Sequence, residues 1–163
     1  MDYRQQINNK IHSRESLVNA VNTWRSEGLS VVFTNGCFDI IHPGHAQYLS
    51  AAAALGDRLV IGVNTDDSIK RLKGNARPVI PEKERCLLLA SFQFADAICL
   101  FDEDTPLQLI TSIMPDVLVK GKDYNIDQIV GADVVLQNGG KVETIELVEG
   151  FSTTTLIEKI RQL

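Results

Sequence analysis

Hydrophobic residues along the chain fall into short runs that alternate with longer amphipathic stretches. Runs of Val, Ile and Leu bounded by Gly, Asn or Asp predict strands, and apolar residues that recur three or four positions apart predict helices. Strands are predicted at 30–35, 58–64, 96–101, 116–121 and 141–147. Helices are predicted at 13–27, 44–55, 81–93, 105–113, 126–137 and 153–162, and residues 1–12 are predicted to be a loose leader.

Several predicted strands are continuous apolar stretches, which is typical of a parallel sheet covered on both faces. Strands that alternate with helices therefore predict an α/β fold, a three-layer sandwich with a Rossmann-like parallel sheet of about five strands. Such sheets bind ligands beyond the carboxyl ends of their strands, where the strand order reverses. No linker or repeat interrupts the chain, so we expect a single domain, with residues 1–29 as leader and first helix and 30–163 as its main body.

Composition and charge exclude several classes of protein. The net charge of -5 gives no basic surface for nucleic acid. No apolar run approaches the roughly 20 residues that cross a bilayer, and the polar amino terminus lacks the apolar centre of a secretory signal. We therefore expect a cytoplasmic protein without membrane or nucleic-acid partners. Cys37, Cys86 and Cys99 show no CxxC spacing, which favours buried thiols over a disulfide or a zinc site.

A cationic segment stands out on this acidic chain. Between positions 70 and 85 the acidic residues are Glu82 and Glu84. The segment suits a small, multiply anionic ligand, although a solvated face would give the same pattern. Its basic residues are Lys70, Arg71, Lys73, Arg77, Lys83 and Arg85.

The sequence TNGCFDIIHPGH, residues 34–45, follows a predicted strand and precedes a predicted helix. Asn35 and Gly36 allow a tight turn, so the amides of Cys37 and Phe38 can face a phosphate. Gly44 keeps the start of the helix open to close contact. A helix amino terminus offers unpaired N–H groups and partial positive charge, so this junction is a candidate phosphate site.

His42 and His45 lie three residues apart at that helix start and can both donate to one phosphoryl group. Metal ligation, or a capping and packing role, is the alternative for this pair. The chain has no Walker loop, no GxGxxG and no nucleophile elbow. A phosphate acceptor is already ionised near neutral pH, since its second pKa is near 6. Its attack on a nucleotide α-phosphorus needs positioning and charge stabilisation rather than a base or a covalent intermediate.

A second candidate is EGFSTTT, residues 149–155, which precedes an amphipathic stretch. Ser152 is predicted to cap the helix, with Thr153 and Thr154 in the first turn. The segment is either a capped terminal helix or a second helix amino terminus that holds the β- and γ-phosphates of a triphosphate.

These motifs resemble the HxGH nucleotidyltransferase superfamily of cytidylyltransferase-like enzymes. Within it the chain is most similar to the D-glycero-β-D-manno-heptose 1-phosphate adenylyltransferases of ADP-heptose and lipopolysaccharide core synthesis. The resemblance runs from about Val31 to Ile160 and implies that 30–163 is a nucleotidyltransferase domain. Its blocks are TNGCFDIIHPGH, VNTDDSIKRLKG (63–74), RPVIPEKER (77–85), PDVLVKGKDY (115–124), IVGADVV (129–135) and EGFSTT (149–154).

The resemblance implies roles for residues that match the family's motifs. His42 and His45 are similar to the pair that stabilises the α-phosphate in the transition state. Lys73 resembles a mobile-loop lysine near the acceptor phosphate, with a role in catalysis and substrate binding. Asp66, at a strand end, is expected to contact sugar hydroxyls.

The resemblance also implies an ATP site. Asp39 would order the phosphate-facing loop, and Arg85 resembles a helix arginine that contacts ligand phosphates or supports them. Mg²⁺ is implied on the phosphates rather than in a metal site made by the protein. The implied ATP-binding residues are Thr34, Asn35, Gly36, Cys37, Phe38, Asp39, Gly44, Arg85, Lys120, Gly121, Asp123, Ser152 and Thr153.

Relatives often carry a fused sugar kinase, so the resemblance implies a separate heptose kinase here, and it also implies a homodimer. The alternative enzyme is a cytidylyltransferase for glycerol 3-phosphate or another small alcohol phosphate. Those relatives carry an arginine two positions before the glycine of the EGxSTT block, where this chain has Val148. A non-catalytic nucleotide-sensing domain is the alternative outside enzymes, and the presence of both histidines disfavours it.

Overall fold

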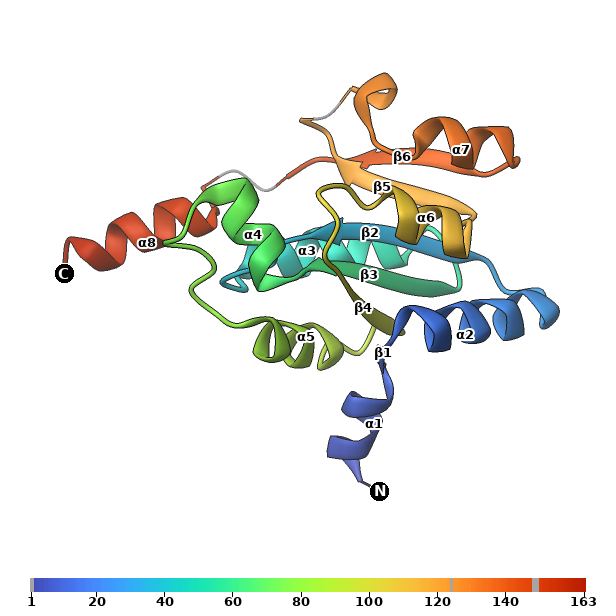
Figure 1. Cartoon of the computed structure of the whole chain (residues 1–163), viewed down its shortest axis with the longest axis horizontal. Helices are drawn as coiled ribbons and strands as arrows, with labels where there is room; N and C mark the ends of the chain where they lie inside the picture. The colour runs from blue at the N-terminus through green and yellow to red at the C-terminus, as the bar shows by residue number, and fades with distance from the viewer. Residues whose placement is uncertain (1, 124, 148–149) are drawn as a thin grey trace.

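One parallel sheet forms the centre of the molecule. The structure is a computed structural model that describes residues 2–123, 125–147 and 150–163. In these ranges six strands pair in the order β1-β4-β3-β2-β5-β6, all parallel (Figure 1). The strands are β1 (Ile11–His12), β2 (Val31–Gly36), β3 (Arg58–Asn64), β4 (Ala97–Phe101), β5 (Val117–Gly121) and β6 (Lys141–Ile145).

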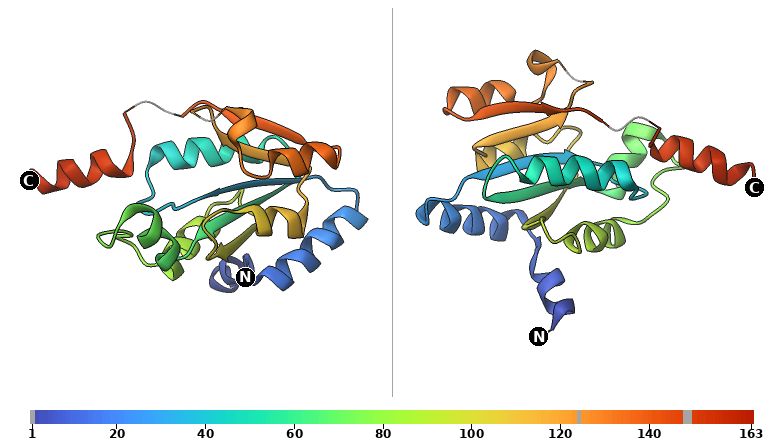
Figure 2. Two further views of the ribbon diagram at one scale, coloured as in Figure 1. Left: turned by 45° about the horizontal axis from the view of Figure 1, so that its top comes forward. Right: turned by 180° about the vertical axis from the view of Figure 1, so that it is seen from behind.

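Helices cover both faces of this sheet, which confirms the predicted three-layer α/β sandwich (Figure 2). The apolar sides of α2, α6 and α7 pack in one core, and those of α3 and α5 pack in the other. Continuous burial of the central strands, as in 59–64 of β3, explains their uninterrupted apolar sequences. The helices are α1 (Tyr3–Asn9), α2 (Arg14–Ser26), α3 (Pro43–Ala53), α4 (Asp66–Lys73), α5 (Glu82–Ala90), α6 (Leu107–Ile113), η1 (Ile126–Gln128), α7 (Ala132–Gln137) and α8 (Thr153–Arg161).

The prediction that residues 1–12 form a loose leader is wrong. Residues 3–9 form α1, whose start is capped by Asp2, and residues 11–12 form the edge strand β1. Ile11 pairs with Ile98 of β4, so this segment extends the sheet. A strand of two residues is too short to leave a hydrophobic pattern in the sequence.

Two further elements differ from the prediction. α4 was not predicted, because six of its eight residues are polar or charged and only Ser68 and Ile69 are buried. The helix predicted at 126–137 is divided into η1 and α7 by Gly131, whose φ is +84°. A Cβ at Gly131 would also meet the Ile110 side chain at 2.8 Å, so the break is built into the packing.

The strand order reverses between β2 and β5, and both strands point their carboxyl ends toward the same edge. Lys120 of β5 crosses this point, because its Nζ donates to Asn35 Oδ1 of β2 at 2.6 Å. Open α/β sheets bind ligands at such a switch point. Among the described residues, no helix is both long and apolar enough to cross a bilayer.

Candidate active site

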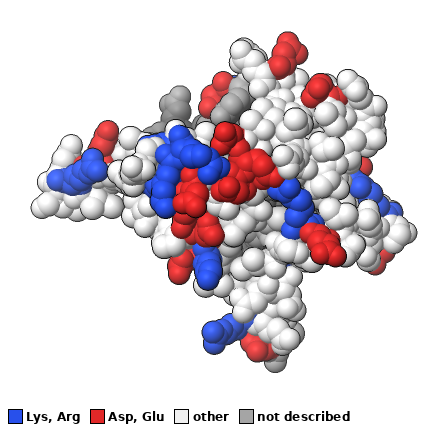
Figure 3. Space-filling view, in the orientation of Figure 1, with Lys and Arg blue, Asp and Glu red and all other residues white. Residues whose placement is uncertain are grey.

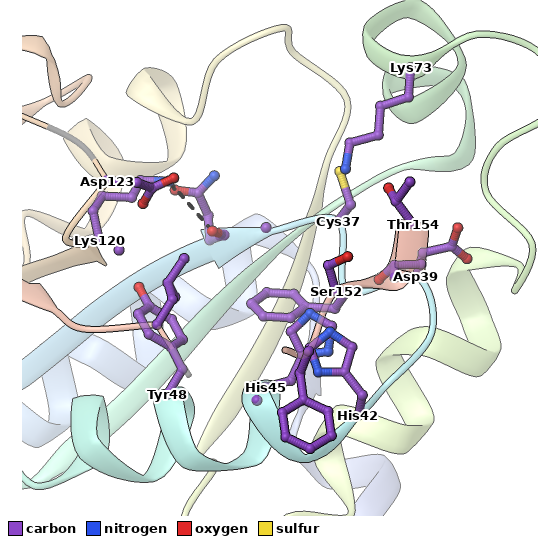
Figure 4. A pocket seen from close by; sticks show the side chains of 18 of the residues that line it. Cys37, Asp39, His42, His45, Tyr48, Lys73, Lys120, Asp123, Ser152 and Thr154 are labelled. Atoms are coloured by element: carbon purple, nitrogen blue, oxygen red, sulfur yellow. Dashed lines mark hydrogen bonds between the residues drawn. The ribbon is translucent and has the colours of Figure 1, made fainter. Parts of the chain in front are cut away.

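Two stacked imidazoles mark the start of α3. His42 is its N-cap residue and forms no capping hydrogen bond with its side chain, and Pro43 begins the helix. The ring centroids of His42 and His45 are 3.7 Å apart, with an angle of 25° between the ring planes. Figure 4 shows both rings together at the pocket. The geometry favours a joint role for the pair over the capping alternative.

Gly44 lets the His42 ring fold back over the helix start. A Cβ at this position would meet Cε1 and Nδ1 of His42 at 3.0 and 3.1 Å and Phe151 Cβ at 3.2 Å. Such contacts are tighter than most real Cβ contacts, so the ring would have to move. The HxGH spacing therefore places its glycine where close approach requires it.

Phe38 supports the second histidine from the opposite side. Its ring meets that of His45 edge-on, with the centroids 5.4 Å apart. The backbone of Phe38 has a φ of +47°, a left-handed conformation that is strained for a bulky residue. A Cβ at Gly36 would meet the Phe38 ring at 3.1 Å. The turn at 36–38 is thus shaped to direct an aromatic ring under His45.

Burial acts against positive charge on both histidines. Burial lowers the pKa of His42. Burial, followed by the charges of His42 and Lys73, lowers the pKa of His45 from 6.5 to about 4. Burial also lowers the pKa of Lys120 to about 8. The site therefore resists positive charge on His45 until an anion enters.

The histidines open into a cavity of about 350 Å³, which we call the histidine pocket. The start of α8 lines the pocket beside the histidines, with the Phe151 ring stacked near that of His42 at 6.3 Å between centroids. Ser152 caps this helix as predicted by accepting a hydrogen bond from the amide of Thr155. Figure 4 shows Lys73 reaching toward Cys37 at this cavity. The predicted site residues that line it are Asn35, Gly36, Cys37, Phe38, Asp39, His42, Gly44, His45, Lys73, Lys120, Gly121, Asp123, Ser152 and Thr153.

Three predicted site residues lie behind this lining. The Thr34 side chain is buried, and its hydroxyl lies 2.8 Å from that of Tyr48. Arg85 is fully buried and donates to the backbone oxygens of Cys37, Asn64 and Ile80. Its Nη2 also pairs with Asp66 Oδ1 at 2.8 Å.

These contacts settle which of the two roles suggested for Arg85 fits the geometry. The side chain holds the loop that carries Cys37 and does not reach the cavity surface. Asp66, expected at sugar hydroxyls, uses Oδ1 for this ion pair, and its side chain is 28% exposed.

Some lining residues were given no site role by sequence reasoning: Tyr48, Arg77, Leu147 and Phe151. Thr154, predicted in the first turn of the candidate phosphate-binding helix, also lines the pocket. Tyr48 follows His45 by three positions, so helical spacing could have placed it on the same face. Arg77 stood in the cationic segment but was given no separate role. Residues 124 and 148–149, which include part of the predicted family blocks and Val148, lie outside the described residues.

The cationic segment is divided between several roles. Lys70 pairs with Asp67, and Arg71 pairs with Asp102 and Asp104, on the exposed surface. Figure 3 shows basic and acidic side chains gathered over α4 on this face. Lys73 and Arg77 instead line the histidine pocket. Lys70 and Arg71 thus form a solvated face, and anion binding stays a prediction for Lys73 and Arg77.

A second cavity of about 440 Å³, the adjoining pocket, lies against the same strand ends. The β4–α6 loop lines it with Asp104 and Thr105, and η1 contributes Gln128. The two pockets share one set of lining residues at the switch point: Asn35, Gly36, Cys37, Lys73 and Lys120.

Comparison with known proteins gives the family. The cytidylyltransferase-like family matches residues 33–159. The bifunctional protein HldE of Syntrophotalea carbinolica is 52% identical over 155 residues, which are 95% of this chain and 32% of the relative. That of Caulobacter vibrioides is 54% identical over 151 residues, 93% of this chain and 31% of the relative. The chain thus spans about a third of the length of these curated relatives.

A solved structure gives the same result. The lipopolysaccharide core biosynthesis protein of Thermoplasma volcanium GSS1 has 28% sequence identity and a TM-score of 0.59, covering 74% of this chain and 98% of that one. The resemblance expected from the HxGH motif is confirmed. The chain belongs to the cytidylyltransferase-like family of nucleotidyltransferases.

Proposed function

We propose that this protein is an adenylyltransferase that transfers AMP from ATP to D-glycero-β-D-manno-heptose 1-phosphate. The products are ADP-heptose, a precursor of the lipopolysaccharide core, and pyrophosphate. The stacked pair of His42 and His45, in a pocket that the amino terminus of α8 also lines, carries this proposal. Similarity to the HldE proteins over nearly the whole chain supports the choice of substrates.

In this proposal the histidine pocket holds ATP. The ring nitrogens of His42 and His45 donate to the α-phosphate, and the capped start of α8 holds the β- and γ-phosphates through Ser152 and Thr153. Asp123 and Leu147 line the same pocket and would lie toward the nucleoside. The site then stabilises the charge that develops on the phosphorus centre and on the leaving pyrophosphate.

The adjoining pocket is where we place the sugar phosphate. Asp104, Thr105 and Gln128 offer polar groups for sugar hydroxyls, and Lys73 lies at the border of both pockets. An oxygen of the ionised acceptor phosphate attacks the α-phosphorus, the bond to the β-phosphate oxygen breaks, and pyrophosphate leaves with that electron pair. This displacement requires no proton from the protein.

Mg²⁺ is part of the proposal as an ion that arrives with the triphosphate. Among the described residues, no group of three or more His, Cys, Asp or Glu side chains is arranged to hold a metal. The donor set therefore fits an ion carried mainly by phosphate oxygens and water, as is usual for Mg²⁺ with nucleotides. There it would neutralise charge on the leaving group.

We also propose a cytoplasmic homodimer that receives its heptose 1-phosphate from a separate kinase. The exposed Leu87 and Leu88 of α5 and Ile160 of α8 offer apolar surface for such a contact. Analytical ultracentrifugation of the full chain measures the association state directly.

Pyrophosphate release from each of the four nucleoside triphosphates, with and without heptose 1-phosphate, tests the reaction. We expect release with ATP that depends on the heptose, and little with glycerol 3-phosphate as a control acceptor. Release that requires CTP and glycerol 3-phosphate would instead identify the cytidylyltransferase alternative. No heptose-dependent release with ATP would refute the proposed reaction.

A further inference from the structure

A buried carboxylate lies beside the histidine pocket. The Asp39 side chain is 1% exposed. It accepts hydrogen bonds from the amides of Val79 and Ile80, both at 2.8 Å, and from Arg77 Nε at 2.5 Å. Burial tends to raise the pKa of Asp39, but these donors outweigh it, and the pKa lies below its usual value. Asp39 is therefore an anion that fixes the 77–80 segment against the HxGH loop.

This arrangement directs the Arg77 side chain. Its backbone is held as well, because the amide of Arg77 donates to Gly74 O at 3.1 Å. The guanidinium uses Nε for Asp39, and its side chain is 15% exposed at the pocket wall. Within the described part of the chain, Nη1 and Nη2 have no hydrogen-bond acceptor. Since the guanidinium is planar, fixing Nε also fixes the plane in which the remaining donors point.

Arg77 and Lys73, the two basic residues of the cationic segment that line the histidine pocket, lie in different places. Lys73 lines both pockets. Arg77 lines the histidine pocket, together with Ser152 and Thr154 at the start of α8, and does not line the adjoining pocket. The group that Arg77 meets therefore belongs to the occupant of the histidine pocket. In the reaction proposed above, that occupant carries three phosphates and releases two of them.

We propose that Arg77 binds the β- and γ-phosphates of ATP and the pyrophosphate that they become, and that Asp39 is its positioning residue. This inference rests on the proposed function only for the identity of the nucleotide. A planar guanidinium with free Nη donors matches a phosphate bidentately. Asp39 cancels part of the positive charge of Arg77, so the benefit comes from the fixed direction of the donors.

Binding of inorganic pyrophosphate, measured by isothermal titration calorimetry, tests Arg77 without any sugar or turnover. Arg77→Ala should weaken pyrophosphate by about tenfold or more, the value of a charge-assisted hydrogen bond. Lys83→Ala is the matched control, because it removes a cation of the same segment whose side chain is exposed away from the pocket. That control should leave affinity within about twofold. Equal affinity in wild type and Arg77→Ala would overturn the proposal.

Steady-state kinetics separate the two phosphate sites. Arg77→Ala should raise the KM for ATP by about tenfold or more and change the KM for the sugar phosphate by less than about twofold. A larger effect on the acceptor KM would place Arg77 at the acceptor and overturn the assignment. Arg77→Lys, which keeps the charge and the stem, provides the same comparison if Arg77→Ala does not fold, and should show a smaller loss.

Asp39→Asn tests positioning against simple charge. The substitution removes a negative charge beside the pocket, so electrostatics alone would tighten pyrophosphate binding. Loss of positioning predicts weaker binding, by about threefold or more, and no further loss when Asp39→Asn is added to the Arg77→Ala variant. Tighter or unchanged binding in Asp39→Asn would refute the positioning role. Pyrophosphate binding is measured without heptose. Its outcome therefore stays interpretable even if the protein does not catalyse the heptose reaction.

Discussion

At the scale of single residues, the unusual feature is a pair of imidazoles held face to face. A pKa of about 4 favours the neutral form of His45, which in the proposed reaction would serve as a hydrogen-bond donor rather than as a permanent cation. Donors fixed in this way help most where charge develops during the reaction, because they need no reorganisation then.

Replacing His45 should therefore affect turnover more than binding. His45→Ala is expected to lower kcat by about a hundredfold or more, while ATP affinity stays within about tenfold. His12→Ala, which changes the histidine outside the pocket, is the matched control. Turnover and equilibrium ATP binding measured on the same preparations decide the matter. Equal losses in the two quantities would mean that His45 contributes only ground-state affinity.

The pKa of His45 gives a second prediction, on proton uptake. A bound triphosphate favours the protonated imidazole, so the pKa of about 4 in the empty site should rise on binding. Between the two pKa values, ATP binding takes up a proton and strengthens as pH falls.

Calorimetry near pH 6 in buffers of different ionisation enthalpy measures this uptake. His45→Gln serves as the reference, because glutamine keeps a hydrogen-bond donor but cannot titrate. Protonation of ATP itself contributes equally to the uptake measured with both proteins. Uptake that is the same in wild type and His45→Gln would assign the proton to another group.

At the scale of elements, the start of α3 depends on the absence of a side chain at Gly44. Gly44→Ala should displace the His42 ring, because the new Cβ would meet it at 3.0 Å. We expect kcat to fall by about tenfold or more, although alanine is intrinsically the better helix former. Thermal unfolding and kcat are measured together, with Gln47→Ala at an exposed position of the same helix as control. Full activity in Gly44→Ala would show that the ring position is not critical.

Elements with continuous apolar sequences were predictable, and short or polar elements were not. Each central strand was found because its residues are buried on both faces. β1 escaped detection because pairing of Ile11 with β4, rather than any periodicity, defines it. α4 has few buried residues and is stabilised by its Thr65 cap and by ion pairs of Arg71. Strand pairing and ion pairs with distant residues produce no periodic pattern in the local sequence.

The same limit applies to the site. The HxGH turn was recognisable because glycine, proline and histidine appear there at fixed spacing. The pairing of Arg77 with Asp39 and the hydrogen bond from Arg85 to Cys37 join residues 38 and 48 positions apart. Sequence reasoning could therefore identify the cations of this segment. It could not tell which of them support the loop from behind and which line the pocket.

At the scale of the whole molecule, the strand order brings the two pockets together. β2 and β5 meet at the switch point, and residues from their carboxyl ends, Asn35 and Lys120, line both cavities. A ligand in each pocket would thus reach the same few residues. In the proposed reaction both substrates would therefore be held at once, with no carrier between them.

This arrangement predicts a sequential reaction through a ternary complex. Initial rates at varied ATP and sugar phosphate should give intersecting rather than parallel double-reciprocal lines. Labelled pyrophosphate should not exchange into ATP unless the sugar phosphate is present, because no adenylylated enzyme forms. Cys37 and the two histidines are among the pocket nucleophiles that could form one. Exchange without acceptor, abolished by Cys37→Ala or His45→Ala, would replace direct transfer at the switch point by a two-step route.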